Sequence, residues 1–180
     1  FYAAPMAANL PRPKAPNVLV SGTPGVGKST FSAMLARELD FTHLNIGDLV
    51  REHGLHDGRN DEFDCFELNE DKVCDYLEPE MITGRKIVDF HGCDLFPERW
   101  FHLIVVLRAS TEQLYDRMVL RGYSEHKRNE NLRAEILNVV IDEARDSYKP
   151  EIILEMQSNN VDEMEQNVER VKQIVKQMMQ

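Results

Sequence analysis

The sequence predicts an α/β fold in which a parallel sheet of five strands is flanked by helices. Short apolar runs alternate along the chain with longer segments that carry apolar residues at helical spacing, which is the pattern of strands joined by crossover helices. The run GTPGVGKS at positions 22–29 has the spacing G-x-x-x-x-G-K-[ST]. It lies between one such strand and one such helix, as a phosphate-binding loop requires. The order of the strands cannot be read from the sequence.

The composition indicates one globular domain. The 180 residues are 42% hydrophobic and 29% charged, and no apolar run approaches the roughly 20 residues needed to cross a bilayer. The net charge of −10 argues against a general nucleic-acid binder, and it fits either docking onto a basic protein or a merely solvated surface. Three cysteines without a C-x-x-C pair indicate a reducing intracellular compartment.

The folded domain is expected to span residues 17–180. Residues 1–16 hold four prolines, and we expect a flexible extension or a cloning remnant there. The apolar run 17–21 predicts the first buried strand. After the loop, residues 30–39 place apolar side chains at helical spacing and predict the first helix.

The loop at 22–29 has the chemistry of a phosphate-binding site. Its glycines allow backbone N–H groups to turn inward around a polyphosphate, and the N-terminus of the next helix adds partial positive charge. Lys28 is expected to reach the β- and γ-phosphates, and Ser29 to offer its hydroxyl to Mg²⁺. The alternative is a glycine-rich turn with a solvated lysine, but the flanking strand and helix favour phosphate binding.

Between residues 41 and 90 the patterns predict a strand, a helix, a polar lobe, a second helix and a strand. The lobe is acidic and has few core residues, so we expect it to be mobile. Pro79 can kink the second helix. The expected ranges are, in order, 41–44, 45–52, 54–69, 69–83 and 86–90.

The remaining chain predicts two more strands and three helices. A ladder of apolar residues at i, i+4 spacing predicts one continuous helix over about 129–148. Residues 121–128 form a short basic connection, which is the only cationic cluster in the sequence. The other expected elements are a strand at 103–108, a helix at 112–120, a strand at 152–156 and a helix at 161–179.

Asp89 and His91 are candidate catalytic residues at the end of a buried strand. Open α/β sheets bind ligands at the carboxyl ends of their strands, so Asp89 is placed to hold Mg²⁺ or to orient a water. The alternative is an ordinary aspartate that caps a turn. His91 could touch a phosphate or orient a nucleophile, or it could be a half-buried structural histidine.

Arginines are candidates for binding the two ends of a phosphate substrate. Arg51 is the candidate clamp for an acceptor, and the alternative is a surface ion pair with Asp48 at i,i+3. Arg121, Lys127 and Arg128 could fold over the triphosphate as a lid, or they could be a solvated charged turn. Arg121 is favoured because it follows a helix and precedes a glycine hinge.

Together these motifs resemble those of adenylate kinases. The resemblance rests on the loop at 22–30, the G-D-L-x-R run at 47–51 and the pattern E-x-L-x-x-R-x-x-x-R-G at 112–122. The stretch DFHGCDLFPERWFH at 89–102 and the R-G-Y run at 121–123 are similar to the adenylate kinase isoenzyme 6 family, the coilin-interacting nuclear ATPases. The resemblance covers about residues 17–178.

The resemblance implies a P-loop NTPase fold with a small acceptor lobe at about 45–68 and a short lid at about 120–130. It implies reversible phosphoryl transfer from MgATP to AMP, and ATP hydrolysis. The residues implied for ATP are Gly25, Gly27, Lys28, Ser29, Thr30 and Arg121; Arg51 is implied for the AMP phosphate, Asp89 and His91 for a modified Walker B pair, and Ser29 with Asp89 (through water) for Mg²⁺.

The resemblance also implies a place in the cell. The family is nuclear, with the cytoplasm as a second location, and it acts in small ribosomal subunit maturation through a basic small-subunit ribosomal protein. We also expect a monomer, and the hydropathy and net charge argue against contact with a membrane or, directly, with nucleic acid.

One departure from ordinary adenylate kinases bears on the reaction. Their D-G-F-P-R segment carries a second arginine for the acceptor phosphate, and here the segment at 89–93 reads DFHGC. A missing cation and a short lid weaken charge neutralisation and water exclusion. Two readings therefore stay open: an AMP kinase that also hydrolyses ATP, or mainly an ATP-driven assembly factor with weak kinase activity.

Overall fold

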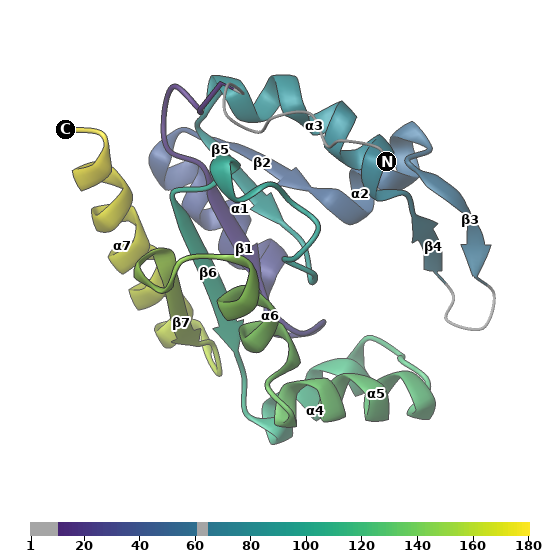
Figure 1. Cartoon of the computed structure of the whole chain (residues 1–180). Coiled ribbons are helices and arrows are strands. Elements are labelled where there is room, and N and C mark those ends of the chain that lie inside the picture. The colour runs from purple at the N-terminus through teal and green to yellow at the C-terminus, as the bar shows by residue number, and fades with distance from the viewer. Residues whose placement is uncertain (1–10, 61–64) are drawn as a thin grey trace.

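The computed structural model describes residues 11–60 and 65–180, with only the backbone of Cys65. Five strands form its central sheet, and they are β1 (Val18–Ser21), β2 (Thr42–Asn45), β5 (Lys86–Asp89), β6 (Leu103–Arg108) and β7 (Ile153–Gln157). They are all parallel and run in the order β2-β5-β1-β6-β7 (Figure 1). The predicted five-stranded parallel sheet is confirmed.

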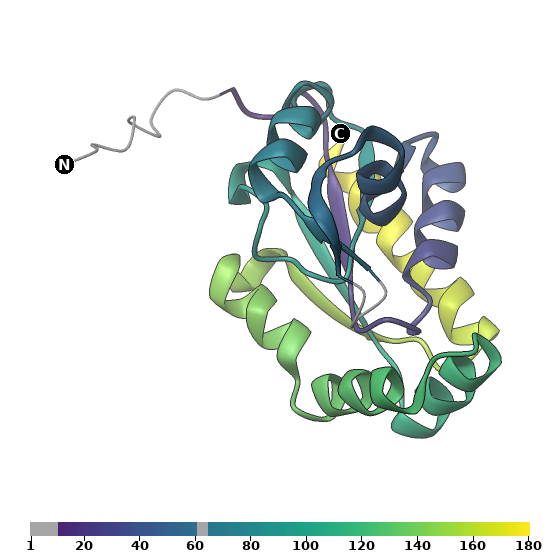
Figure 2. The same cartoon turned by 90° about the vertical axis from the view of Figure 1, so that its right-hand side faces the viewer.

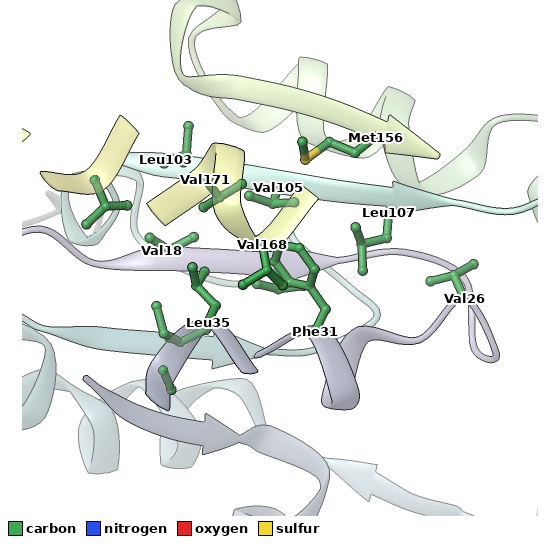
Figure 3. Close-up of a cluster of buried hydrophobic side chains, with 14 of the residues drawn as sticks. Val18, Val26, Phe31, Leu35, Leu103, Val105, Leu107, Met156, Val168 and Val171 are labelled. Atoms are coloured by element: carbon green, nitrogen blue, oxygen red, sulfur yellow. The ribbon is translucent and has the colours of Figure 1, made fainter. Parts of the chain in front are cut away.

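Helices cover both faces of the sheet, because its inner strands are apolar on both sides. They are α1 (Lys28–Leu39) and α7 (Val161–Met178) on one face, and α2 (Ile46–His53), α3 (Glu70–Thr83) and α6 (Val139–Ser147) on the other. Successive side chains of a strand point to opposite faces, so Leu19 and Val20 belong to different cores. Figure 3 shows Val18 of β1, Phe31 of α1 and Val171 of α7 in the same buried cluster.

Two pairs of elements lie outside the layers formed by the sheet and its covering helices. One is an antiparallel hairpin of β3 (His56–Asn60) and β4 (Cys65–Leu68), and the other is the helix pair α4 (Thr111–Leu120) and α5 (Glu125–Ile136). The strand arrows of β1 and β6 point toward the α4–α5 pair, while the hairpin projects to one side of the sheet (Figures 1 and 2). Short 3₁₀ turns lie at Glu98–Trp100 and Pro150–Ile152.

The prediction of one continuous helix over 129–148 is wrong. The chain forms α5 and α6, separated at Asn138, which adopts the left-handed conformation with φ 58°. Arg108 fixes this break, because its Nη2 donates to the Glu135 carbonyl at 3.0 Å and to Asn138 Oδ1 at 2.8 Å. Ile136, a member of the predicted apolar ladder, is 62% exposed at the break.

The predicted connection at 121–128 is also shorter than expected. Ser124 caps α5 by accepting a hydrogen bond from the Lys127 N–H at 3.2 Å, so the helix begins at Glu125. The acidic lobe at 54–69 likewise contains the β3–β4 hairpin, which its weak alternation did not reveal.

The described part of the expected N-terminal extension packs on the domain. The Lys14 N–H donates to the Ile82 carbonyl at 3.0 Å, and the Arg85 N–H donates to the Pro16 carbonyl at 3.0 Å. Residues 14–16 therefore lie against the end of α3 and the start of β5, while residues 1–10 lie outside the described part. Within the described ranges, no helix is both long and apolar enough to span a bilayer.

Candidate active site

The candidate site forms at the carboxyl ends of β1, β2 and β5. The register pairs Asp89 with Asn45 on one side and with Val20 on the other, which places Asp89 between β2 and the start of the phosphate loop. This is the edge at which open α/β sheets bind ligands. The parallel pairing thus brings together residues that are more than 40 positions apart in the chain.

The phosphate loop depends on glycine where it leaves β1. Gly22 has φ 147°, and a Cβ there would lie 2.6 Å from the Leu107 carbonyl oxygen, which no side chain tolerates. Gly27 ends the loop with φ 99° as the N-cap of α1, and a Cβ at this position would meet Met164 at 2.8 Å. The loop therefore places the first turn of α1 at the site, where Ser29 and Thr30 are exposed.

Lys28 folds back across the loop. Its Nζ donates to the Gly22 carbonyl at 2.7 Å and to the Thr23 carbonyl at 3.3 Å. Burial, and to a smaller extent the charge of Arg121, lower the pKa of Lys28 to about 8, while the charges of Asp89 and Glu135 oppose the shift. An ammonium so depleted of water favours an anionic ligand, because a phosphate would replace its lost solvation.

Asp89 is held in its ionised form by neighbouring donors. It is only 2% exposed, and its Oδ2 lies 2.9 Å from Asn45 Nδ2 and 3.2 Å from His43 Nε2. Burial by itself raises the pKa of Asp89, but hydrogen bonds from His43 and Ser29 and the charge of Lys28 outweigh it, so the pKa is lowered. Asp89 is therefore a carboxylate aimed at the Ser29 hydroxyl.

His91 is neutral at physiological pH. Neighbouring protein atoms desolvate the imidazole, and this effect together with the charge of Lys28 lowers the pKa of His91 to about 4. Part of the residue is nevertheless exposed to solvent. Its backbone carbonyl accepts a hydrogen bond from Ser21 Oγ at 2.9 Å, which fixes the segment after β5 against the end of β1. A neutral imidazole here can accept or donate a hydrogen bond without adding charge.

Ser29 and Asp89 fit the way proteins hold Mg²⁺ beside a nucleotide. Among the described residues, no group of three or more histidine, cysteine or carboxylate side chains could cage a metal by itself. Mg²⁺ usually keeps several waters and takes one or two protein oxygens plus phosphate oxygens. The pair of one hydroxyl and one ionised carboxylate matches that donor set.

A cleft beside the loop is the candidate acceptor site. It has a volume of about 460 Å³ and is lined by Ser29, His43, Leu44, Asn45, Asp48, Leu49 and Glu52. Arg51, the expected acceptor clamp, is not in the lining; its Nη2 donates to Asp48 Oδ1 on the surface of α2. An exposed i,i+3 ion pair of this kind contributes little to the free energy of unfolding, so the Arg51 guanidinium can leave Asp48 and bind another anion at little cost.

The three candidate lid cations behave differently. Lys127 Nζ lies 4.4 Å from the centroid of the Tyr123 ring, and Arg128 donates to the Tyr123 carbonyl at 2.5 Å. Both cations are thus engaged within the lid itself. Arg121 is exposed, and it alone of the three lies close enough to Lys28 to lower the pKa of that residue.

Four side chains in the site were given no role by the sequence reasoning. Arg117 on α4 donates to the Ser158 and Asn159 carbonyls at 2.9 and 2.7 Å and to the Gly25 carbonyl at 3.4 Å. His43 and Asn45 hold Asp89, and Glu135 contacts the loop residue Thr23 at 2.5 Å. Only the strand order would have found His43 and Asn45, because it makes β2 the neighbour of β5.

Comparisons with known proteins identify the family of this chain. Residues 18–138 match the family model described as an AAA domain. The chain is 46% identical to the adenylate kinase isoenzyme 6 homologue of Dictyostelium discoideum over 88% of this chain and 90% of that protein. It is 42% identical to the homologue of Saccharomyces cerevisiae over 87% of this chain and 80% of that protein.

Solved structures show the same fold at low identity. The shikimate kinase of Bacteroides thetaiotaomicron superposes with a TM-score of 0.62 at 14% identity, covering 89% of this chain and 98% of that one. Within this fold, the high identity to the isoenzyme 6 homologues over nearly the whole chain decides the family. This chain is a P-loop phosphotransferase and belongs to the adenylate kinase isoenzyme 6 family.

Proposed function

We propose that this protein transfers the γ-phosphoryl group of MgATP to AMP and forms two molecules of ADP. The observation that carries the proposal is the position of Ser29, which follows Lys28 in the phosphate loop and also lines the acceptor cleft. The phosphate end of a donor on the loop therefore faces an acceptor in the cleft. The names of the relatives, all adenylate kinase isoenzyme 6 homologues, support AMP as that acceptor.

Each residue has a defined part in this proposal. Phosphoryl transfer depends on positioning and charge neutralisation more than on covalent chemistry. The loop N–H groups from Gly25 to Thr30 and the Lys28 ammonium hold the ATP phosphates, and Arg121 neutralises charge from the lid. Ser29 and Asp89 hold Mg²⁺, which screens the phosphates when bound. Arg51 leaves Asp48 and binds the AMP phosphate.

We further propose ATP hydrolysis as a second activity at the same site. The segment after Asp89 lacks the second arginine, because Cys93 stands at its position, and it carries His91, whose imidazole is neutral beside Lys28 and Asp89. A neutral imidazole can orient water for attack, whereas an arginine would have bound an acceptor phosphate. This exchange supports competition between water and AMP for the γ-phosphoryl group.

A role in small ribosomal subunit maturation in the nucleus is part of the proposal. It is supported by the resemblance to the isoenzyme 6 family and by the net charge of −10, which suits docking onto a basic small-subunit ribosomal protein. Such a partner is expected to raise the rate of ATP hydrolysis when it is added to the purified protein.

The test is an incubation of the purified chain with MgATP, with and without each nucleoside monophosphate. The proposal expects ADP formation that depends on AMP, above a slower release of inorganic phosphate in its absence. Phosphate release unaffected by any monophosphate would overturn the kinase function and leave an ATPase. Lys28→Ala is the matched control, because loss of its ammonium should remove both activities.

A further inference from the structure

A buried carboxylate lies against the phosphate loop without taking part in the proposed chemistry. Glu135, in the last turn of α5, is 5% exposed, and its Oε2 accepts a hydrogen bond from Thr23 Oγ1 at 2.5 Å. Thr23 is the second residue of the loop and is fully buried. Helix α5 begins inside the expected lid at 120–130 and is called the lid helix below. Its last turn and the phosphate loop are joined by this short hydrogen bond between residues 112 positions apart in the chain.

The second oxygen of Glu135 is fixed from the sheet. Arg108 Nε donates to Glu135 Oε1 at 2.6 Å, and the Ala109 N–H donates to the same oxygen at 3.3 Å. A buried carboxylate is tolerated only when it is paired and hydrogen bonded in this way. Because Arg108 also holds the end of α5, Glu135 cannot swing away from Thr23 without breaking the whole cluster.

Thr23 connects Glu135 to Lys28 through two hydrogen bonds. Its hydroxyl donates to Glu135, while its carbonyl accepts a hydrogen bond from Lys28 Nζ at 3.3 Å. The orientation of the Thr23 peptide therefore sets one of the two carbonyls that hold Lys28. A hydrogen bond to an ionised acceptor is stronger than one between neutral groups, so the Thr23 anchor is a firm one.

We propose that Glu135 and Thr23 are positioning residues that couple the lid helix α5 to the phosphate loop and so set the affinity for MgATP. Glu135 touches no substrate; it acts through Thr23 on the loop and on Lys28. The inference rests on the proposed function, in which the loop binds the ATP phosphates. It adds a buried link between the lid and the loop that pre-organises the loop for the nucleotide.

The test uses Thr23→Val in the full chain, because valine keeps the shape of threonine and removes the donor. We expect calorimetric titration with MgATP to show about tenfold weaker binding, as loss of a hydrogen bond to a charged group implies. The KM for ATP rises by a similar factor while the KM for AMP stays constant. Thr23→Ser, which keeps the hydroxyl, restores binding toward the wild-type affinity.

Glu155→Gln is the matched control. Glu155 accepts from Arg108 Nη1 at 2.8 Å on the exposed side, so this variant perturbs the same arginine without touching Thr23, and its MgATP affinity should match the wild type. Unchanged MgATP affinity in Thr23→Val, an equal rise in both KM values, or no recovery in Thr23→Ser overturns the proposal. Because the titration needs no acceptor, a protein that binds MgATP in a Thr23-dependent manner but does not phosphorylate AMP would refute only the kinase function.

Discussion

Replacement of Asp89 by asparagine tests whether the ionised carboxylate of Asp89 stabilises the fold and supports Mg²⁺-dependent activity. The lowered pKa of Asp89 means that the folded protein prefers the ionised form, so a neutral replacement should destabilise the fold. Both Asn45 and His43 contact the same oxygen, Oδ2, so asparagine can place its one oxygen there, but the negative charge is lost. The variant keeps both contacts as hydrogen bonds to a neutral acceptor instead of a charged one.

The expected cost follows from those contacts. Two hydrogen bonds to a charged group, of about 1.5–3 kcal/mol each, become neutral ones of about 0.5–1.5 kcal/mol each, so the free energy of unfolding should fall by about 2 kcal/mol. For a chain of this length the melting temperature then falls by roughly 4–8 °C. Activity should fall about 10- to 100-fold, with a higher Mg²⁺ requirement, since a group that orients a metal has been lost.

The assay is thermal unfolding of wild type and Asp89→Asn from pH 7 down to pH 3, with Mg²⁺-dependent ADP formation at neutral pH. The stability contributed by Asp89 is present above the ordinary aspartate pKa of 3.8 and is lost as pH falls through the lower folded pKa, so the two melting curves should converge at the acid end. Asp142→Asn is the control, because its exposed pair with Arg145 contributes little. An Asp89→Asn variant that is more stable than wild type at pH 7 would refute the reasoning.

Three further predictions concern the cations and the histidine. Lys28→Ala should lower kcat at least about 100-fold in the ADP assay while the melting temperature stays within a few degrees of wild type; a similar kcat would remove Lys28 from the mechanism. Arg51→Ala should raise the KM for AMP about tenfold and leave the KM for ATP unchanged, whereas Arg121→Ala should do the reverse; identical kinetic profiles would contradict the division into acceptor and donor sites. The folded pKa of His91 is about 4, below its ordinary 6.5, so wild-type stability should decline as pH falls from 6.5 toward 4, and His91→Gln should decline less; equal losses in melting temperature between pH 7 and pH 5 would argue against a depressed pKa.

The sequence predicted the sheet and the loop well, because both depend on local pattern. The apolar strands and the glycine spacing of residues 22–29 need no long-range information, and Asp89 at a strand end follows from the same logic. The break between α5 and α6 could not be predicted in this way. It depends on Arg108, about 30 positions earlier, reaching Glu135 and Asn138.

The same limit explains the missed residues of the site. A glutamate at position 135 in a helical pattern is normally on a solvated face, and only the packed structure shows that it is buried against Thr23. His43 and Asn45 became informative once β2 was found beside β5. Arg51 shows the opposite case, because the structure contains the ion pair with Asp48 that the sequence offered as the alternative, while Arg51 does not line the candidate acceptor cleft. Its part as the acceptor clamp stays a prediction.

The central claim is that the γ-phosphoryl group passes directly from ATP on the loop to AMP in the cleft. The most direct measurement is transfer of label from γ-³²P-ATP, resolved by chromatography of the products at early times. The account predicts that the label appears in the β-position of ADP when AMP is present, and that AMP suppresses its appearance in inorganic phosphate. Label found only in inorganic phosphate, at a rate that AMP leaves unchanged, would contradict it.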